Sequence, residues 1–250
     1  MKAVILAAGK GTRMGDLTEE TPKPMLPVEG RPILEQILTG LREAGIQEFC
    51  LITGWQAEVI ESHFGDGSAF GVHINYVRQK VQDGTGKAPE LAKVFLGEAP
   101  FLLTYGDILV KPDTYRQMLA RWDGGELSGL VTVTGSEDVT KGGLFFFDND
   151  FFLQYLVEKP SAAQLEELLA AGWLKSGEPA WYNAGIYCFT PSLFQYTAQL
   201  AKSPRGEYEL TDALTAMLSE DHAIAGLAIE GRWVDVRDPC VLQALQESAE

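Results

Sequence analysis

The first residues of the chain combine glycines with positively charged side chains. Gly9 and Gly11 follow a short apolar run, and Lys10, Arg13 and Lys23 lie beside them or shortly after them. Small residues let backbone N–H groups approach phosphate oxygens closely, and nearby cations neutralise the phosphate charge. This pattern predicts a loop that binds a phosphate-bearing ligand. A surface loop with solvated charges is the alternative.

Two common nucleotide motifs do not fit this loop. A dinucleotide-binding fingerprint needs a third glycine three residues after Gly11, but that position is Met14, and Gly15 comes one residue late. A P-loop needs Gly-Lys followed by Ser or Thr after four intervening residues, and this pattern is absent too. The loop therefore indicates phosphate binding without placing the chain in either class.

Two aspartates are candidates for binding a divalent cation. Asp107 follows the apolar run 101–104, and Asp235 lies in the strand-like segment 233–236. Mg²⁺ prefers oxygen ligands and often takes one or two protein carboxylates together with phosphates and water. An aspartate after a strand is also common as a turn or helix cap, which is the alternative interpretation.

The elements that must position these residues alternate along the first half of the chain. Apolar runs predict strands, and apolar residues at helical spacing predict helices. Regular alternation of this kind indicates an α/β fold with a doubly wound, mostly parallel, Rossmann-like sheet that binds ligands at the carboxyl ends of its strands. The predicted strands are 3–8, 49–53, 72–77, 101–104 and 127–134, and the predicted helices are 33–44, 57–64, 88–96 and 114–122.

Beyond residue 140 the pattern changes. Segments 143–147 and 151–157 flank Asp148-Asn149-Asp150, which suits a hairpin turn. We therefore expect antiparallel strands to extend a mixed sheet here. The remaining predicted elements are strands 181–189 and 233–236 and helices 162–171, 193–201, 210–219 and 239–247.

The composition excludes several classes of protein. A chain of 250 residues with 46% hydrophobic and 22% charged residues suits a globular domain with a substantial core. The net charge of −15 argues against a nucleic-acid partner, and no apolar run approaches the roughly 20 residues of a membrane span. The start lacks a signal-peptide pattern, and Cys50, Cys188 and Cys240 form no CxxC pair, so we expect reduced structural thiols in a cytoplasmic protein.

The fuller pattern at the N-terminus resembles a known family. Leu6-Ala7-Ala8-Gly9-x-Gly11-Thr12-Arg13-Met14, followed by Thr21-Pro22-Lys23-Pro24-Met25-Leu26-Pro27-Val28, is similar to the signature of sugar-1-phosphate nucleotidyltransferases, among them the glucose-1-phosphate uridylyl- and thymidylyltransferases. Two separated motifs match in order, and later segments extend the likeness over nearly the whole chain. The resemblance implies a Mg²⁺-dependent enzyme that joins a nucleoside triphosphate to a sugar-1-phosphate and releases pyrophosphate.

The resemblance also implies roles for the two N-terminal motifs. In the family the glycine-rich loop wraps the triphosphate. Arg13 would stabilise the departing β,γ-phosphates, and Lys23 would contact the phosphates around the reacting centre, so both are predicted to be catalytic. Nucleotide binding would fall to Leu6, Ala8, Gly9, Gly11 and Thr12.

A later segment is similar to the base-reading part of family members that use UTP or dTTP. There a glutamine side chain and a glycine backbone meet the pyrimidine edge, and these roles carry over to Gln79 and Gly84, with Thr85 beside them. A helix-entry loop with Thr85 near the N-cap is the alternative. By the same resemblance, the metal ligands are Asp107 and Asp235, and the sugar-phosphate contacts are Gly143, Glu158, Lys159 and Asn183.

The sequence departs from the family pattern just after Asp235. Many members have Gly-Thr-Pro or a similar small, polar step there, whereas Val236-Arg237-Asp238-Pro239 follows in this chain. Arg237 could contact phosphate, or Asp238 could cap the final helix with Pro239 at its first position. The sequence leaves open whether Arg237 replaces a usual phosphate contact.

These roles imply one nucleotidyltransferase domain over 1–250, with a nucleotide-binding part at about 1–135 and a sugar-phosphate-binding part with a closing helix at about 136–250. The expected reaction is an in-line displacement in which the sugar phosphate attacks the α-phosphorus while Mg²⁺ bridges the substrates. Two alternatives stay open: an idle regulatory relative, and a nucleotidyltransferase for a non-sugar phosphate such as phosphocholine. We expect no acyltransferase repeat domain, and a homo-oligomer is compatible with the sequence.

Overall fold

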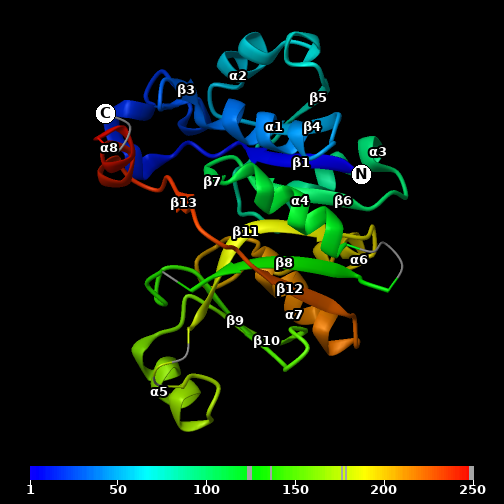
Figure 1. Ribbon diagram of the computed structural model, residues 1–250, viewed down its shortest axis with the longest axis vertical. Coiled ribbons are helices and arrows are strands. Elements are labelled where there is room, and N and C mark those ends of the chain that lie inside the picture. Colours follow the sequence, from blue (N-terminus) through cyan, green and yellow to red (C-terminus); the bar gives the residue numbers. More distant parts are fainter. Residues whose placement is uncertain (123–125, 136, 176, 178, 248–250) are drawn as a thin grey trace.

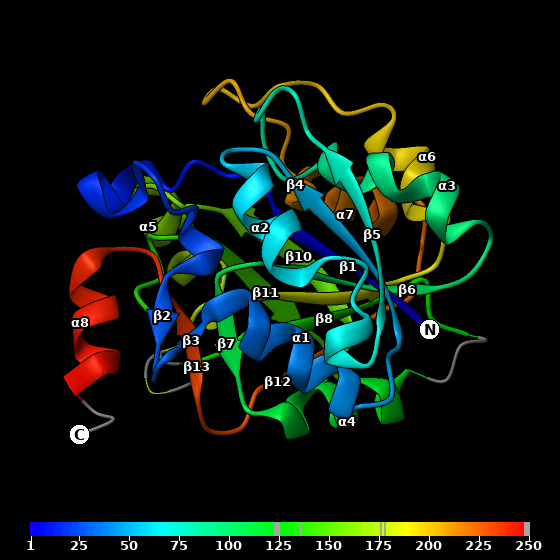
Figure 2. The ribbon, with the colours of Figure 1, turned by 90° about the horizontal axis from the view of Figure 1, so that it is seen from above.

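The computed structural model describes residues 1–122, 126–135, 137–175, 177 and 179–247. One mixed sheet of nine strands lies at its centre, with helices on both faces (Figure 1, Figure 2). The α/β class predicted from the sequence is confirmed. Along the sheet the strands are β10 (Leu153–Glu158), β9 (Gly143–Phe147), β11 (Trp181–Phe189), β6 (Phe101–Tyr105), β1 (Lys2–Ala7), β4 (Glu48–Thr53) and β5 (His73–Arg78), and β8 (Gly129–Thr134) pairs with β11 and β12 (Ile224–Ala228).

Strand β1 is buried on both faces, which explains its unbroken apolar run. It pairs in parallel with β4 and β6, and its alternate side chains enter opposite cores, as Ile5 and Val4 do. The core around Ile5 includes side chains of α1 (Ile33–Glu43), α2 (Ala57–Phe64) and α4 (Pro112–Arg121). The core around Val4 includes those of α3 (Lys93–Leu96), α6 (Leu193–Thr197) and α7 (Leu210–Ser219).

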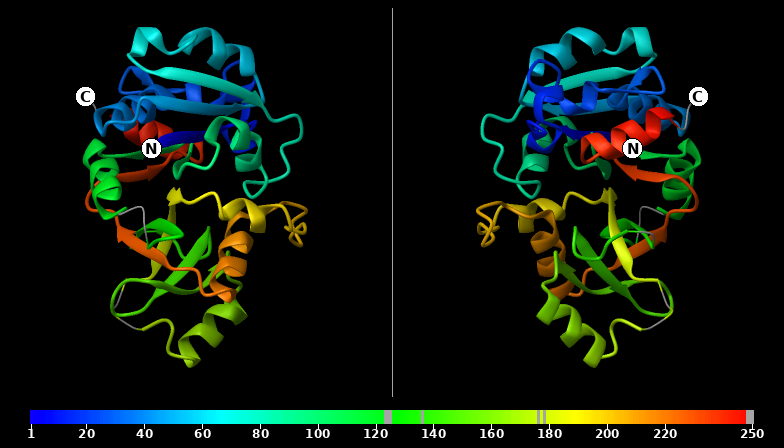
Figure 3. Two further views of the ribbon diagram at one scale, coloured as in Figure 1. Left: turned by 90° about the vertical axis from the view of Figure 1, so that its right-hand side faces the viewer. Right: turned by 90° about the vertical axis from the view of Figure 1, so that its left-hand side faces the viewer.

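The hairpin of β9 and β10 is the antiparallel extension expected beyond residue 140. Its turn is held by Asp148, whose Oδ1 accepts the backbone N–H groups of Asp150 and Phe152. The antiparallel register places Glu158 opposite Gly143. Helix α5 (Ala162–Ala170) follows and lies at the far end of the molecule from α2 (Figure 1, Figure 3).

The last elements of the chain return to its N-terminal half. Strand β13 (Trp233–Asp235) pairs with β7 (Ile108–Val110) in a separate small sheet, and α8 (Pro239–Glu247) packs near the hairpin of β2 (Pro27–Val28) and β3 (Arg31–Pro32) (Figure 1). Strand β8, in contrast, pairs with the later strands β11 and β12. The division of the chain at about residue 135 stays a prediction. Elements from after this point, β13 and α8, pack with the N-terminal half, whereas β8, from before it, pairs with the later strands.

Several predicted elements differ from the observed ones. The helix predicted at 88–96 is a 3₁₀ segment, η4 (Ala88–Ala92), followed by the short α3, which ends at Leu96 and is capped by Gly97 with a positive φ. The helix predicted at 193–201 ends at Thr197 as α6. The sequence reading missed β7, β12 and the β2–β3 hairpin, because two- and three-residue strands carry no periodic signal and β12 is rich in alanine and glycine, which disfavour strands.

The cysteines do not all lie in the core. Cys50 and Cys188 are buried, and burial raises the pKa of the Cys50 thiol to about 11, whereas Cys240 is exposed on α8. The expectation that these cysteines are reduced structural thiols stays a prediction, and the exposure of Cys240 separates it from the two buried thiols. Within the described residues, no helix has both the length and the apolar character needed to span a bilayer.

The hydroxyl of Tyr115 generates a prediction about stability. Tyr115 is 1% exposed, and its hydroxyl has no hydrogen-bond partner among the described residues. An unpaired buried hydroxyl costs about 1–3 kcal/mol, so Tyr115→Phe is expected to raise the free energy of unfolding by about 1 kcal/mol. Urea unfolding followed by circular dichroism measures this change.

The matched control is Tyr187→Phe. The Tyr187 hydroxyl is also fully buried, but it donates a hydrogen bond to Asn183 Oδ1 over 2.9 Å. Its removal is expected to lower the free energy of unfolding by about 1 kcal/mol. Equal effects of the two substitutions would contradict the role given to hydrogen bonding.

Candidate active site

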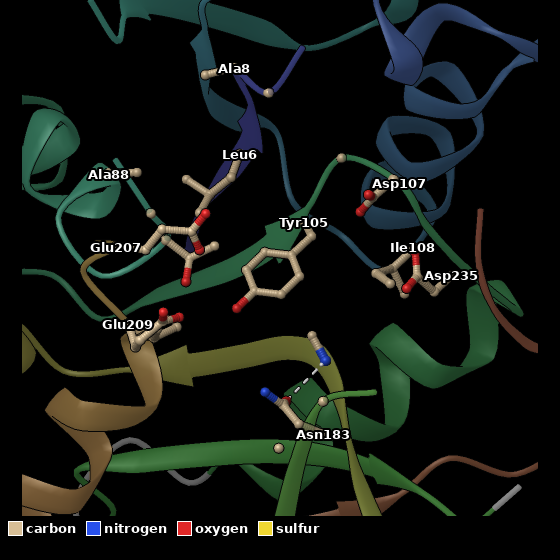
Figure 4. A pocket seen from close by; sticks show the side chains of 18 of the residues that line it. Leu6, Ala8, Ala88, Tyr105, Asp107, Ile108, Asn183, Glu207, Glu209 and Asp235 are labelled. Carbon is tan, nitrogen blue, oxygen red and sulfur yellow. Dashed lines mark hydrogen bonds between the residues drawn. The ribbon is translucent and has the colours of Figure 1, made fainter. Parts of the chain in front are cut away.

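The predicted site residues meet in one cavity of about 480 Å³. It lies beyond the carboxyl ends of β1 and β6 and is closed on the other side by residues of β10, β11 and the segment before α7. Figure 4 shows this arrangement, with Tyr105 between Leu6 above and Asn183 below. All of the residues predicted for the site line this cavity: Leu6, Ala8, Gly9, Gly11, Thr12, Arg13, Lys23, Gln79, Gly84, Thr85, Asp107, Gly143, Glu158, Lys159, Asn183 and Asp235.

The two N-terminal motifs pack against each other at Gly11. This residue has φ +67°, and a Cβ atom there would lie 2.9 Å from Cβ of Lys23. Any larger residue would be strained in this conformation and would press on Lys23. Lys23 itself belongs to the short 3₁₀ turn η2 (Lys23–Met25) and is only 6% exposed. The glycine loop and the Thr-Pro-Lys-Pro segment thus form one structural unit.

Lys10 and Arg13 diverge from this unit. Arg13 is exposed and lines the cavity, so its charge faces the space that a ligand would occupy. Lys10 is not among the cavity-lining residues, and its ammonium group lies 4.5 Å from the centre of the Trp55 ring. The structure therefore separates the cations of the loop into one at the cavity and one stacked on an aromatic ring.

Lys23 lies between two carboxylates. Its Nζ is 2.5 Å from Asp107 Oδ2 and 4.0 Å from Asp235 Oδ1. Pairing of β7 with β13 brings the aspartates together, and the backbone N–H of Val236 donates to the carbonyl of Asp107. Figure 4 shows both carboxylates on the same side of the cavity. Burial and the neighbouring Asp107 carboxylate raise the pKa of Asp235 to about 6, against the opposing effect of Lys23.

This pair of carboxylates suits a hard divalent cation. The described residues contain no group of three or more His, Cys, Asp or Glu side chains that could hold a metal ion. Two carboxylates beside a cavity with room for phosphates fit Mg²⁺, which often uses one or two protein carboxylates and takes its other ligands from phosphate and water. They do not fit a cation that requires a complete set of protein ligands.

Glu158 and its neighbours form the opposite wall of the cavity. Gly143 makes room for Glu158, since a Cβ at Gly143 would lie 3.1 Å from Glu158 Oε2. Burial raises the pKa of Glu158, while the charges of Arg205 and Lys159 oppose this effect. Lys159 has φ +44°, a left-handed conformation that is rare and strained for a residue with a side chain. Strain of this kind is concentrated at functional sites.

Asn183 is held in a fixed orientation. Its Oδ1 accepts hydrogen bonds from the Tyr187 hydroxyl and from the backbone N–H of Gly185, at 2.9 and 3.2 Å. The hydroxyls of Tyr187 and Tyr105 are themselves 3.2 Å apart. Because the amide oxygen is occupied, the NH₂ group of Asn183 is the part left to donate to a ligand.

Gln79 continues the edge of β5. Its backbone N–H donates to the carbonyl of Thr53, and its own carbonyl accepts the side-chain amide of Gln82. Both glutamines line the cavity. The sequence reading missed Gln82, although it lies in the same segment.

The sequence reading also missed the segment before α7. Arg205 pairs with Glu158 and Glu209 over 3.4 and 2.7 Å, and Thr211 donates to Glu158 over 3.3 Å. The available signal was the polar turn Ser203-Pro204-Arg205-Gly206, which precedes a helix as ligand-binding loops often do. The other lining residues not predicted include Lys141, Tyr105, Glu207 and Trp233.

After Asp235, where the sequence departs from the family pattern, two contacts show what Arg237 and Asp238 do. Arg237 Nη2 lies 2.6 Å from Glu137 Oε2, and Asp238 Oδ1 accepts the backbone N–H of Val241 at the start of α8. Asp238 therefore caps the final helix. Arg237 pairs with Glu137 and does not line the cavity, so it does not occupy the place of a phosphate contact in this structure.

Comparison with known proteins agrees with this geometry. A family model described as "Nucleotidyl transferase" matches residues 2–245. This chain belongs to the nucleotidyl transferase family. Agl11 of Haloferax volcanii, the low-salt glycan biosynthesis nucleotidyltransferase, is 32% identical to it over 96% of this chain and 63% of that protein. The chain thus spans less than two thirds of that relative's length.

Two further relatives of this nucleotidyl transferase cover most of both chains. The UTP–glucose-1-phosphate uridylyltransferase AglF of H. volcanii is 28% identical over 96% of this chain and 92% of that protein. A Bacillus anthracis structure, described as a "Putative Glucose-1-Phosphate Thymidylyltransferase" in complex with a sucrose, is 26% identical with a TM-score of 0.84. That likeness covers 100% of this chain and 95% of the other.

The raised pKa of Glu158 generates a prediction about stability and pH. A carboxyl whose pKa is higher in the folded state favours folding at acidic pH, and this contribution is lost as the pH rises from about 4.5 through the raised value. Glu158→Gln removes the titration. We expect the variant to exceed the parent in free energy of unfolding by about 1 kcal/mol at pH 8, a typical size for one substitution.

Thermal and urea unfolding at several pH values between 5 and 8 measure this difference, which should shrink toward pH 5. Glu166→Gln on the exposed face of α5 is the matched control and should show no such trend. A Glu158→Gln variant less stable than the parent at pH 8 would show that the ion pair with Arg205 outweighs the burial of the carboxylate.

Proposed function

We propose that this chain catalyses the transfer of a nucleotidyl group from a pyrimidine nucleoside triphosphate to a sugar-1-phosphate, with release of pyrophosphate. The observation that carries the proposal is the single cavity lined at one end by Arg13, Lys23 and two aspartates and at the other by Glu158, Lys159 and Asn183. A polyanionic substrate suits the first end. A polyhydroxylated phosphate suits the second.

The arrangement favours an in-line displacement. An oxygen of the sugar phosphate attacks the α-phosphorus, the bond from that phosphorus to the bridging oxygen breaks, and pyrophosphate leaves with the electron pair. Such a reaction needs alignment and charge neutralisation more than a covalent protein group. Among the described residues, the one hydrogen-bonded Ser–His contact, between Ser128 and His222, does not line the cavity.

Each cation has a distinct place in this scheme. Lys23 is nearly buried and fixed between carboxylates, so it can hold the phosphates around the reacting centre in one position. Arg13 is exposed at the cavity and can follow the charge that develops on the departing pyrophosphate. Lys159 lies on the sugar wall and can pair with the phosphate of the second substrate.

Asp107 and Asp235 would hold Mg²⁺. When bound there, the ion supplies positive charge that screens the two anionic substrates from each other. Lys23 forms an ion pair with Asp107 and lies within reach of Asp235, so it keeps the two carboxylates close together when they would otherwise repel. These carboxylates are therefore poised for a cation before any substrate binds.

The base preference rests on Gln79 and on the relatives. A glutamine amide offers one donor and one acceptor, which match the N3–H and a carbonyl of uracil or thymine. Similar proteins include one named for UTP and one described as a thymidylyltransferase. Glu158 and the NH₂ group of Asn183 can bind sugar hydroxyls, which favours a sugar-1-phosphate over a non-sugar phosphate such as phosphocholine.

The test of the proposed function is pyrophosphate release with UTP, dTTP, GTP and ATP, each against a panel of sugar-1-phosphates and phosphocholine. UTP or dTTP is expected to exceed GTP in kcat/KM by at least about tenfold, because unpaired buried polar groups penalise the wrong base. Gln79→Ala should reduce this preference, whereas Gln82→Ala should keep it. A purine triphosphate as the best substrate would refute the base assignment, and ligand binding without turnover would indicate a regulatory protein.

Arg13 provides a second prediction. Arg13→Ala should lower kcat by about two to three orders of magnitude, as loss of other transition-state donors does, and should change the KM for the triphosphate much less. Steady-state kinetics on the best substrate pair measure both. Arg116→Ala on α4, which removes an exposed arginine that does not line the cavity, is the control. A decrease of less than about fivefold in kcat would exclude Arg13 from catalysis.

Asp107 provides a third prediction. Asp107→Asn keeps the size of the side chain and removes its charge, so the Mg²⁺ concentration for half-maximal activity should rise by about tenfold, a loss typical for a weakened metal site, and the maximum should fall. Asp113→Asn on α4 is the matched control at an exposed aspartate. Circular dichroism checks that the fold is intact. An unchanged Mg²⁺ dependence would show that Asp107 acts only as a partner of Lys23.

A further inference from the structure

Two segments that are distant in sequence and both line the cavity contact each other near Gln79. They are residues 83–87, which precede η4, and residues 198–209, which precede α7, and together we call them the clasp. The backbone N–H of Tyr208 donates to the carbonyl of Asp83 over 2.7 Å, and the N–H of Gly86 donates to the carbonyl of Tyr208 over 2.8 Å. Both backbone polar groups of Tyr208 therefore bond to the first segment, although neither segment is part of the sheet.

The glycines of the first segment are required by this contact. Gly84 has φ +116°, and a Cβ there would lie 2.3 Å from the carbonyl oxygen of Tyr208. A Cβ at Gly86 would lie 2.5 Å from a methyl group of Leu200 and 2.9 Å from the backbone of Glu209. Contacts this short are not tolerated against backbone atoms. The close approach of the two segments thus accounts for Gly84 independently of any base.

Lys87, in the first segment, contacts the second segment through its side chain. Its Nζ donates to the carbonyl of Ala198 over 3.1 Å and lies 5.2 Å from the centre of the Tyr208 ring. Lys202 lies at a similar distance, 5.4 Å, from the same ring, but it belongs to the second segment. Lys87 therefore bridges the two segments, and Lys202 does not.

The second segment also reaches the sugar wall. Glu209 Oε1 accepts a hydrogen bond from the Ser203 hydroxyl over 3.0 Å and forms an ion pair with Arg205 over 2.7 Å. Arg205 lies in addition 3.4 Å from Glu158. The second segment thus contacts residues 83–87 through Tyr208 and contacts Glu158 through Arg205, which lies three residues before Tyr208. Lys87 and Glu158 are connected through one short stretch of chain.

We propose that the clasp couples the two substrate positions, so that binding of the triphosphate base at residues 79–85 stabilises Tyr208 and Arg205 in their observed positions and strengthens binding of the sugar phosphate at Glu158. This inference rests on the proposed function. Lys87 and Tyr208 act as positioning residues in it. By thermodynamic linkage the sugar phosphate strengthens triphosphate binding by the same factor. The coupling opposes the repulsion between two anions in one cavity.

Calorimetric titration tests the coupling. The dissociation constant of α,β-methylene-UTP, which cannot transfer its nucleotidyl group, is measured with and without saturating α-D-glucose 1-phosphate in the presence of Mg²⁺. If the turnover panel selects another pair, the corresponding analogue and sugar phosphate are used. In the parent protein we expect about fivefold tighter binding with the sugar phosphate, at the lower end of usual coupling factors.

Two lysine variants distinguish the effect of the bond between the two segments from the effect of positive charge near the Tyr208 ring. Lys87→Met removes the bond to Ala198 and should reduce the coupling factor to about one. Lys202→Met removes the same charge from the same ring without opening the clasp, so it should keep the coupling of the parent. Equal coupling in the parent and in Lys87→Met, or equal loss in both variants, would overturn the proposal.

Hydrogen exchange gives a readout that does not depend on turnover. α,β-Methylene-UTP alone should slow exchange of the Tyr208 amide in the parent protein and in Lys202→Met but not in Lys87→Met. An unchanged exchange rate of the Tyr208 amide in the parent protein would overturn the proposed coupling. Turnover with mutually independent binding of the two substrates would overturn the proposed coupling but not the proposed function. Absence of turnover with every substrate pair would overturn both the proposed function and the coupling.

Discussion

The ion pair between Lys23 and Asp107, with Asp235 beside it, is the interaction on which the site depends. Two carboxylates in a partly buried place repel each other, and burial adds to the cost of their charge. Lys23 offsets this cost, but only because Gly11 lets its side chain pass close to the glycine loop. One contact thus connects the glycine loop, the Thr-Pro-Lys-Pro segment and the small sheet of β7 and β13.

The mixed sheet provides the frame for this interaction. The parallel strands β1 and β6 end at the cavity and deliver the glycine loop and Asp107, as parallel sheets deliver ligand-binding residues at their carboxyl ends. The antiparallel strands β10 and β11 run into the same cavity and carry Glu158 and Asn183. A change of strand direction at β6 and β11 therefore places two sets of polar residues face to face.

Much of the fold, and which residues line the candidate site, was predictable from the sequence. Buried parallel strands such as β1 leave unbroken apolar runs, and the motifs around Gly11 and Lys23 are local in sequence, so both were recognised. The contacts that join distant segments were not predictable. Nothing in the residues 203–209 shows that Tyr208 bonds to Asp83, and nothing at Arg237 shows that Glu137 is its partner. Such contacts depend on how the elements pack, and single-sequence patterns do not contain that information.

The pairing of β7 with β13 has a consequence for synthesis of the protein on the ribosome. Ile108 faces Asp235 in that small sheet, and the whole antiparallel half of the molecule is translated between them. At typical elongation rates the interval lasts roughly 6–25 s. During this time the nascent chain presents β7 without β13. The two aspartates therefore come together only after residue 235 has been synthesised, late in translation.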